Sequence, residues 1–238
     1  MNDLIQIIIL TLIAGLAMPI GASVAAIENI RPRWLEKEVR HSVIAFGGGA
    51  LLAAVALVLV PEGIKELSLM TTAICFAAGG ISFMLLDMQL AKNNTSLSQL
   101  VAMLSDFIPE ALALGATFAV SSSAGILLAG IIALQNLPEG FNAFREIRAS
   151  THYSKLLIVG ALAAMALLGP VSGLLGYFFL TDFPQIKAGI MLFAAGGILY
   201  IIFQDIAPQV KLKQHWAPPL GALAGFLLGI VGKVVVGE

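Results

Sequence analysis

The chain has 238 residues, of which 59% are hydrophobic and 11% are charged, and its mean hydropathy is +0.96. These values exclude a soluble globular domain, and the formal net charge of -1 gives no reason to expect a nucleic-acid partner. The single cysteine, Cys75, excludes an internal disulfide and a cluster of thiolate ligands.

Eight apolar runs are long enough, at roughly 20 residues each, to cross a hydrocarbon core of about 30 Å. In chain order they cover residues 4–29, 42–61, 71–91, 97–120, 124–146, 156–180, 186–207 and 217–236. The first run follows "MND", which lacks the positive charge of a signal peptide, so we expect a retained helix. The predicted fold class is therefore all-α: a polytopic membrane protein with eight transmembrane helices in one domain, embedded in a lipid bilayer.

The orientation follows from the distribution of Lys and Arg, which tend to stay on the cytoplasmic side. Of the thirteen, ten lie on one side: Arg31, Arg33, Lys37, Arg40, Lys92, Arg145, Arg148, Lys155, Lys211 and Lys213. Three lie on the other side: Lys65, Lys187 and Lys233. This bias predicts that both termini face outward, most simply across the cell (plasma or inner) membrane.

Two distant stretches share a pattern. "FGGGALLAAVALVLVP" at 46–61 and "FAAGGILYIIFQDIAP" at 193–208 place Phe, Gly, Leu and Pro at identical offsets, 147 residues apart. The two spans that contain them cross in opposite directions, which is typical of the inverted-topology repeats of transporters. We therefore expect a 3+2+3 arrangement, with repeats in 1–96 and 148–238 around a central helix pair in 97–147.

The central pair contains two similar polar strings, "SDFIPEALALGA" at 105–116 and "ALQNLPEGFNAF" at 133–144. Positions i and i+4 share a helix face, so Asp106 lies with Glu110 and Gln135 with Glu139. A proline, 109 or 138, precedes each glutamate. Because proline lacks an N–H, we expect each helix to bend there and to free a carbonyl.

An ionised side chain near the membrane midplane costs from about 2.5 kcal/mol upward. The three carboxylates of Asp106, Glu110 and Glu139 therefore need a cation or protons to remain together. A divalent metal bound by these carboxylates and the Gln135 amide oxygen would balance their charge. An alternative stays open, in which Glu110 and Glu139 hydrogen-bond to nearby backbone and only stabilise a kinked bundle.

The strings "DFIPE" (106–110) and "QNLPE" (135–139) resemble the motifs of the ZIP (Zrt-/Irt-like) family of divalent metal transporters. That family has eight spans, outward termini and a 3+2+3 arrangement. Its fourth span carries His-Asn-x-Pro-Glu/Asp and its fifth His/Gln-x-x-Pro-Glu, which together form a two-metal site at mid-membrane. The resemblance covers essentially the whole chain, and it also implies a homodimer.

The resemblance implies one metal position with four ligands: Asp106, Glu110, Gln135 and Glu139. A second position would keep Asn136 and share Glu110 and Glu139. The family usually has asparagine where this chain has Phe107, which cannot ligate, so we expect poor occupation of the second position. Asp106 replaces the usual histidine. "AKNNTSLSQ" stands where many members have a histidine-rich loop, so metal sensing by that loop is not expected.

Polar residues near the membrane surfaces suggest a path to this site. In the family, residues placed like Asp87, Gln204 and Asp205 help metal to leave inward, and Glu62 and Glu66 could attract cations at an outer entrance. Both groups also fit a simpler interpretation, as interfacial or solvated side chains that reach water.

The sequence thus predicts a transporter of divalent transition metals toward the cytoplasm. Zinc ranks first on family grounds, followed by iron, manganese or cadmium. The metal would be cargo, and no prosthetic group is expected. A metal-selective channel remains an alternative. An intramembrane metal-dependent hydrolase is less favoured, because the chain lacks a HExxH or GxSG motif and we do not expect an enzyme.

Overall fold

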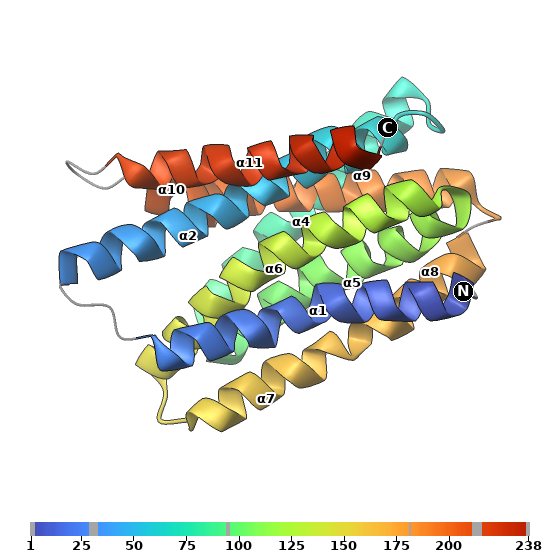
Figure 1. The fold of residues 1–238 in the computed structure, drawn as a ribbon. Helices are drawn as coiled ribbons and strands as arrows, with labels where there is room; N and C mark the ends of the chain where they lie inside the picture. The colour runs from blue at the N-terminus through green and yellow to red at the C-terminus, as the bar shows by residue number, and fades with distance from the viewer. Residues whose placement is uncertain (1–2, 29–32, 94–95, 181, 211–215, 237–238) are drawn as a thin grey trace.

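A computed structural model describes residues 3–28, 33–93, 96–180, 182–210 and 216–236, which form helices and no strand (Figure 1). The elements are α1 (Asp3–Ile27), α2 (Arg33–Ala54), η1 (Val55–Leu59), α3 (Val60–Gly63), α4 (Leu69–Asn93), α5 (Ser96–Val120), α6 (Ser122–Ser150), α7 (Lys155–Ala166), α8 (Leu168–Leu180), α9 (Pro184–Ile201), η2 (Ile202–Ile206), α10 (Ala207–Val210) and α11 (Ala217–Val236). The predicted all-α class is confirmed, and the helices lie within a few residues of the predicted spans outside the 42–61 span, where α2 starts earlier.

Seven helical stretches in the described part of the chain are long and apolar enough to cross a membrane. The eighth predicted span corresponds to α5, which has 25 residues. At about 1.5 Å per residue, a helix of this length exceeds a hydrocarbon core of about 30 Å.

The outer surface carries large apolar side chains that no other part of the described chain covers. Leu69 on α4 is 88% exposed, and Leu223 on α11 is 66% exposed. Water would disfavour such a surface, whereas lipid tails accommodate it. This exposure supports the assignment to the membrane.

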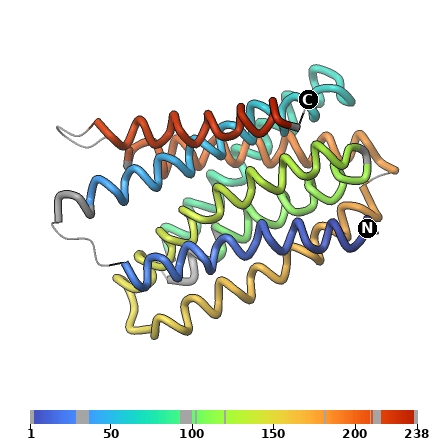
Figure 2. The backbone as a smooth tube through the Cα atoms, viewed as in Figure 1, coloured from blue at the N-terminus to red at the C-terminus, as the bar shows by residue number. Residues whose placement is uncertain are grey.

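The helices form two layers (Figures 1 and 2). α2, α4, α9 and α11 make one layer, and α1, α5, α6, α7 and α8 make the other. Glycines let backbones approach closely within each layer. Glycine permits this approach because it has no Cβ. A Cβ added at Gly49 would lie only 2.0 Å from the carbonyl oxygen of Ala222, and one added at Gly140 only 2.0 Å from the carbonyl oxygen of Met18. Such contacts between small residues are typical of helix packing in membranes.

The first described helix begins and the last one ends at the same end of the bundle (Figure 1). An even number of crossings produces this arrangement. The side of the membrane on which this end lies stays a prediction.

Two spans contain a π-helical segment of five residues shortly before a proline. In η1 the N–H of Val60 donates to the carbonyl oxygen of Val55, and in η2 the N–H of Ala207 donates to the carbonyl oxygen of Ile202. Each bond joins residues five positions apart, which is the spacing of a π-helix. Pro61 and Pro208 follow directly. A proline cannot pair with the carbonyl four residues earlier and its ring crowds that carbonyl, so a wider turn relieves the contact.

The prolines of the central pair behave differently. Pro109 and Pro138 lie inside α5 and α6, which remain α-helical throughout. Irregular backbone lies in η1 and η2, and the bends that we expected at Pro109 and Pro138 stay a prediction. The span 156–180 is also interrupted, at Leu167 between α7 and α8, where Pro170 cannot donate to the carbonyl of Ala166.

Candidate metal site between α5 and α6

The two polar strings face each other because α5 and α6 are consecutive antiparallel helices that pack against each other. Ser121 connects the helices and caps α6, since its side-chain oxygen accepts a hydrogen bond from the N–H of Ala124 at 3.2 Å. Glu110 and Gln135 each lie about a dozen residues from Ser121 along opposite helices. They therefore reach similar depth in the bundle.

The centre of the site is a buried contact between Glu110 and Gln135. Their side chains are 2% and 0% exposed, and the Gln135 amide nitrogen (Nε2) donates to Glu110 Oε1 at 2.5 Å. Glu110 Oε2 and Gln135 Oε1 are also buried but have no hydrogen-bond partner. Two buried acceptor oxygens from two helices thus have no donor from the protein, which is an unfavourable arrangement on its own.

Asp106 and Glu139 lie around this contact. Asp106 Oδ1 is a third buried acceptor without a partner. The Asp106 carboxylate lies within electrostatic range of Glu139 and Glu110, and Glu139 lies within range of Glu110. The structure therefore brings together the four side chains that the sequence predicts for the first metal position.

These side chains do not converge on a single point. In the part of the chain that the structure describes, no group of three or more His, Cys, Asp or Glu side chains is placed to hold a metal ion. Ligation by the four residues consequently stays a prediction.

Asn136 and Phe107, the residues of the predicted second position, both point into helix packing. The Asn136 amide nitrogen (Nδ2) donates to the Ala14 carbonyl oxygen of α1 at 2.9 Å, and the side chain is 1% exposed. Phe107 is likewise 1% exposed. A Cβ on Gly15 or Gly169 would lie 2.9 or 2.8 Å from Phe107 Cζ, so glycines of α1 and α8 make room for this ring.

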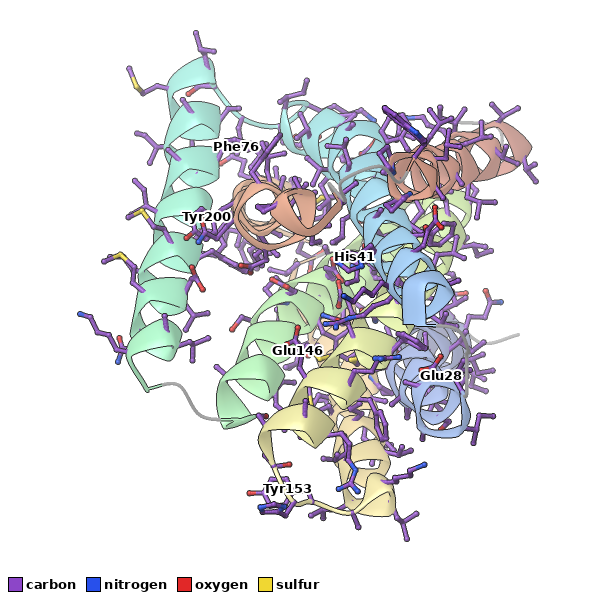
Figure 3. The ribbon with its side chains drawn as sticks, turned by 90° about the vertical axis from the view of Figure 1, so that its left-hand side faces the viewer. Glu28, His41, Phe76, Glu146, Tyr153 and Tyr200 are labelled. Carbon is purple, nitrogen blue, oxygen red and sulfur yellow. The ribbon has the colours of Figure 1, made fainter. Side chains whose placement is uncertain are left out.

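Polar residues also gather near the end of the bundle at which α4 ends and α11 begins. The Tyr200 hydroxyl of α9 donates to Asp87 Oδ2 of α4 at 3.0 Å. Asp205 in η2 lies within electrostatic range of Asp87 and of Glu146 on α6. Figure 3 views this end, with Tyr200 beside α4 and Glu146 on the central pair.

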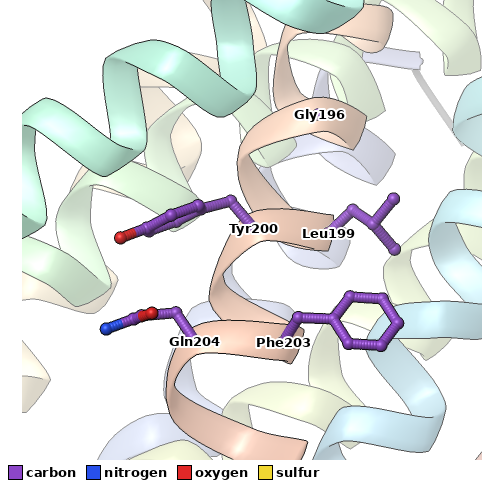
Figure 4. Close-up of a pocket in the computed structure, with 5 residues that line it drawn as sticks. All are labelled: Gly196, Leu199, Tyr200, Phe203 and Gln204. Atoms are coloured by element: carbon purple, nitrogen blue, oxygen red, sulfur yellow. The ribbon is translucent and has the colours of Figure 1, made fainter.

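Gln204 lines a shallow, open pocket of about 350 Å³ together with Gly196, Leu199, Tyr200 and Phe203 (Figure 4). The side chains of Tyr200 and Gln204 project from the same side of the span (Figure 4). Tyr200 and Glu146 were not among the residues expected here from the sequence. Tyr200 could have been found, because it lies one helical turn before Gln204.

At the opposite end, Glu62 accepts a hydrogen bond from the ammonium of Lys65 and forms an ion pair with it. This pairing reduces the negative charge that Glu62 could offer to an incoming cation. Glu66 is exposed. The structure thus favours the interpretation of these two residues as solvated surface charges.

The comparison of this chain with protein-family models finds no match, and the comparison with curated proteins finds none either. The resemblance to the ZIP family therefore rests on the two Pro-Glu strings and on the number and order of the spans.

Proposed function

We propose that this protein is a membrane transporter of divalent transition-metal cations, with zinc as the first candidate and iron, manganese or cadmium as further ones. The cation would bind between α5 and α6 and move toward the cytoplasm. The proposal rests mainly on one observation: Asp106, Glu110 and Gln135 each contribute a buried acceptor oxygen that has no donor. A set of oxygen acceptors without donors is suited to a cation.

The alternative of a purely structural role fits this observation less well. Structural polar residues would place their oxygens on backbone or side-chain donors, because a buried unpaired acceptor costs about 1–3 kcal/mol. The Gln135 amide supplies one donor to Glu110, and three neighbouring oxygens remain without one. Carboxylate and amide oxygens together can bind Mn²⁺ and Fe²⁺, and Zn²⁺ competes strongly for such sites.

Movement of the cation would follow from the predicted inverted repeats. The π segments η1 and η2 begin at Val55 and Ile202, which are 147 residues apart, the same offset as the sequence pattern. Each segment precedes a proline of the shared pattern, Pro61 or Pro208, and the equal offset of the two prolines accounts for part of this match. This coincidence supports a common architecture for 1–96 and 148–238.

The glycine contacts follow the same symmetry. A Cβ on Gly225 would lie 2.0 Å from the carbonyl oxygen of Phe46, and one on Gly79 would lie 1.9 Å from that of Phe193. Phe46 and Phe193 are again 147 residues apart. Two repeats of opposite orientation can exchange their conformations, which opens a central site to one side and then to the other.

Acidic residues provide a route from the site toward the predicted cytoplasmic end. Asp106 lies within electrostatic range of Asp205, which in turn lies within range of Asp87 and Glu146. A cation that leaves the centre would therefore meet negative charge at each step. We propose Asp87, Gln204 and Asp205 as exit residues and add Glu146 to them.

The direct test is uptake of a panel of divalent metals by purified protein in proteoliposomes. Glu139→Gln preserves the volume of the side chain but removes its charge, so uptake should nearly vanish while the variant still folds. Glu66→Gln is the matched control at an exposed position. It should change uptake only modestly, since exposed charges are screened within about 10 Å at 0.1 M salt. Uptake by Glu139→Gln at the parent rate would exclude the site between α5 and α6 as the substrate site.

The same assay separates a carrier from a channel. Uptake that saturates with metal concentration and rises steeply with temperature supports alternating access. Currents of single-channel size would instead support a continuous pore.

A further inference from the structure

Lys233 makes an unusual contact inside the layer formed by α2, α4, α9 and α11. Its ammonium nitrogen (Nζ) donates to the backbone carbonyl oxygen of Leu57 at 2.7 Å. Leu57 lies in η1, four residues before Pro61. Its carbonyl is the one that an ordinary residue at position 61 would pair with through its N–H. The lysine thus supplies the donor that the proline lacks.

The packing of α11 on α2 places Lys233 there in a defined register. Cβ atoms on Gly221, Gly225 and Gly229 would lie 2.4 Å from Ser42 O, 2.0 Å from Phe46 O and 2.3 Å from Ala53 Cβ. These glycines recur every four residues along one face of α11, and Lys233 is the next position in the row. Ala53 lies one turn before Leu57, just as Gly229 lies one turn before Lys233. The contact between Gly229 and Ala53 is therefore followed, one turn further along both helices, by the contact between Lys233 and Leu57.

The equivalent place in the other repeat carries the opposite chemistry. Gly79 of α4 lies against the Phe193 carbonyl, just as Gly225 of α11 lies against the Phe46 carbonyl. Lys233 comes eight positions after Gly225, and the residue eight positions after Gly79 is Asp87. Asp87 accepts the hydroxyl hydrogen of Tyr200. A carboxylate cannot donate to a backbone carbonyl, so Asp87 cannot supply to η2 the donor that Lys233 supplies to η1.

We propose that Lys233 is a positioning residue that fixes the π segment η1, by making the hydrogen bond to Leu57 that Pro61 cannot make. This bond is charge-assisted and lies near the end of a membrane span, where a lysine needs a partner or water. It holds the second half of the α2–α3 span in one conformation. The proposal concerns the fold and does not depend on the metal.

Amide hydrogen exchange of the metal-free protein in detergent tests this role. Lys233→Met should accelerate exchange across Val55–Val60 about tenfold, a fold-change that corresponds to about 1.4 kcal/mol. Exchange in the second half of α6 should not change, which separates a local effect from global destabilisation. Lys233→Arg retains a cationic donor and should stay near the parent rate. Lys65→Met removes a positive charge from the same end of the bundle, on a side chain that pairs with Glu62, and should leave the segment unchanged.

A second substitution makes the test specific. Pro61→Ala restores an N–H at position 61, which can pair with the Leu57 carbonyl, so Lys233→Met should have little further effect in the Pro61→Ala protein. An equal acceleration in both backgrounds overturns the proposal, as does a parent-like rate for Lys233→Met alone. If Lys233→Met does not fold by itself, recovery of folding in the double variant supports the proposal, and failure to recover overturns it.

Discussion

Replacement of Glu110 by glutamine tests the candidate site most directly, because it keeps the shape of the side chain and removes one charge. Glu110 is 2% exposed and accepts a hydrogen bond from Gln135. A hydrogen bond to a charged group contributes about 1.5–3 kcal/mol and one between neutral groups about 0.5–1.5 kcal/mol. The weaker bond therefore costs about 1–1.5 kcal/mol. Relief of the buried charge offsets this by about 2.5 kcal/mol or more.

The apo variant should consequently be at least as stable as the parent. Its affinity for metal should fall sharply. Two unit charges about 4 Å apart interact by about 4 kcal/mol at an effective dielectric constant of about 20, and a divalent cation doubles this value. Even if solvent and neighbouring groups compensate for most of that energy, a loss of about 2.7 kcal/mol remains. That loss corresponds to about a hundredfold weaker binding.

Calorimetric titration of purified protein with Zn²⁺ and Mn²⁺ measures this loss, and the thermal midpoint with and without metal provides a second readout. Asp182→Asn is the matched control, because Asp182 is exposed in the connection before α9. It should bind metal as the parent does. A Glu110→Gln protein that binds metal within threefold of the parent would refute the assignment of Glu110 as a ligand. A metal-free variant that unfolds well below the parent would instead indicate a structural role.

Four further predictions concern topology, packing and the occupation of the metal positions. In a cysteine-free background, cysteines at Ser122 and Ser150 should be labelled from opposite sides of the membrane, with Ser122 outside; labelling of both from one side would remove the inverted-repeat argument. Gly49→Ala should lower the thermal midpoint, because overpacking costs about 1–3 kcal/mol, whereas Gly130→Ala should have little effect, since a Cβ there meets nothing within 4 Å. Phe107→Ala should destabilise the protein by about 3–5 kcal/mol. Crystals of the parent soaked in Zn²⁺ or Cd²⁺ should show one strong metal peak, and two full peaks about 4 Å apart would show that Phe107 does not suppress the second position.

The spans could be predicted well because a membrane imposes a single requirement, a run of apolar residues long enough to cross it. That requirement acts on each helix separately and is visible in the local sequence. The pairing of Glu110 with Gln135 depends instead on how α5 and α6 face each other. The i, i+4 rule correctly places Asp106 with Glu110 on one face, but it does not reveal which neighbour that face meets.

Asn136 illustrates the same point, because the local sequence does not show which neighbouring helix its side chain meets. It follows Gln135 directly, and neighbouring helical residues point about 100° apart. Gln135 therefore faces α5, whereas Asn136 faces the Ala14 carbonyl of α1. The family resemblance assigns Gln135 to the first metal position and Asn136 to the second. The geometry gives Asn136 a contact that holds α6 against α1.

The prolines show most clearly why local sequence is insufficient. Pro61 and Pro208 follow π segments, whereas Pro138 lies in continuous α-helix, although all three lack the same N–H. The surroundings of Pro138 differ, because a Cβ on Gly47 of α2 would lie 2.8 Å from its ring atom Cγ. A glycine of one layer thus receives a proline of the other, immediately before Glu139. Any shift of α2 relative to α6 must alter this contact, so the proline of the motif links the proposed binding residue to the interface between the two layers.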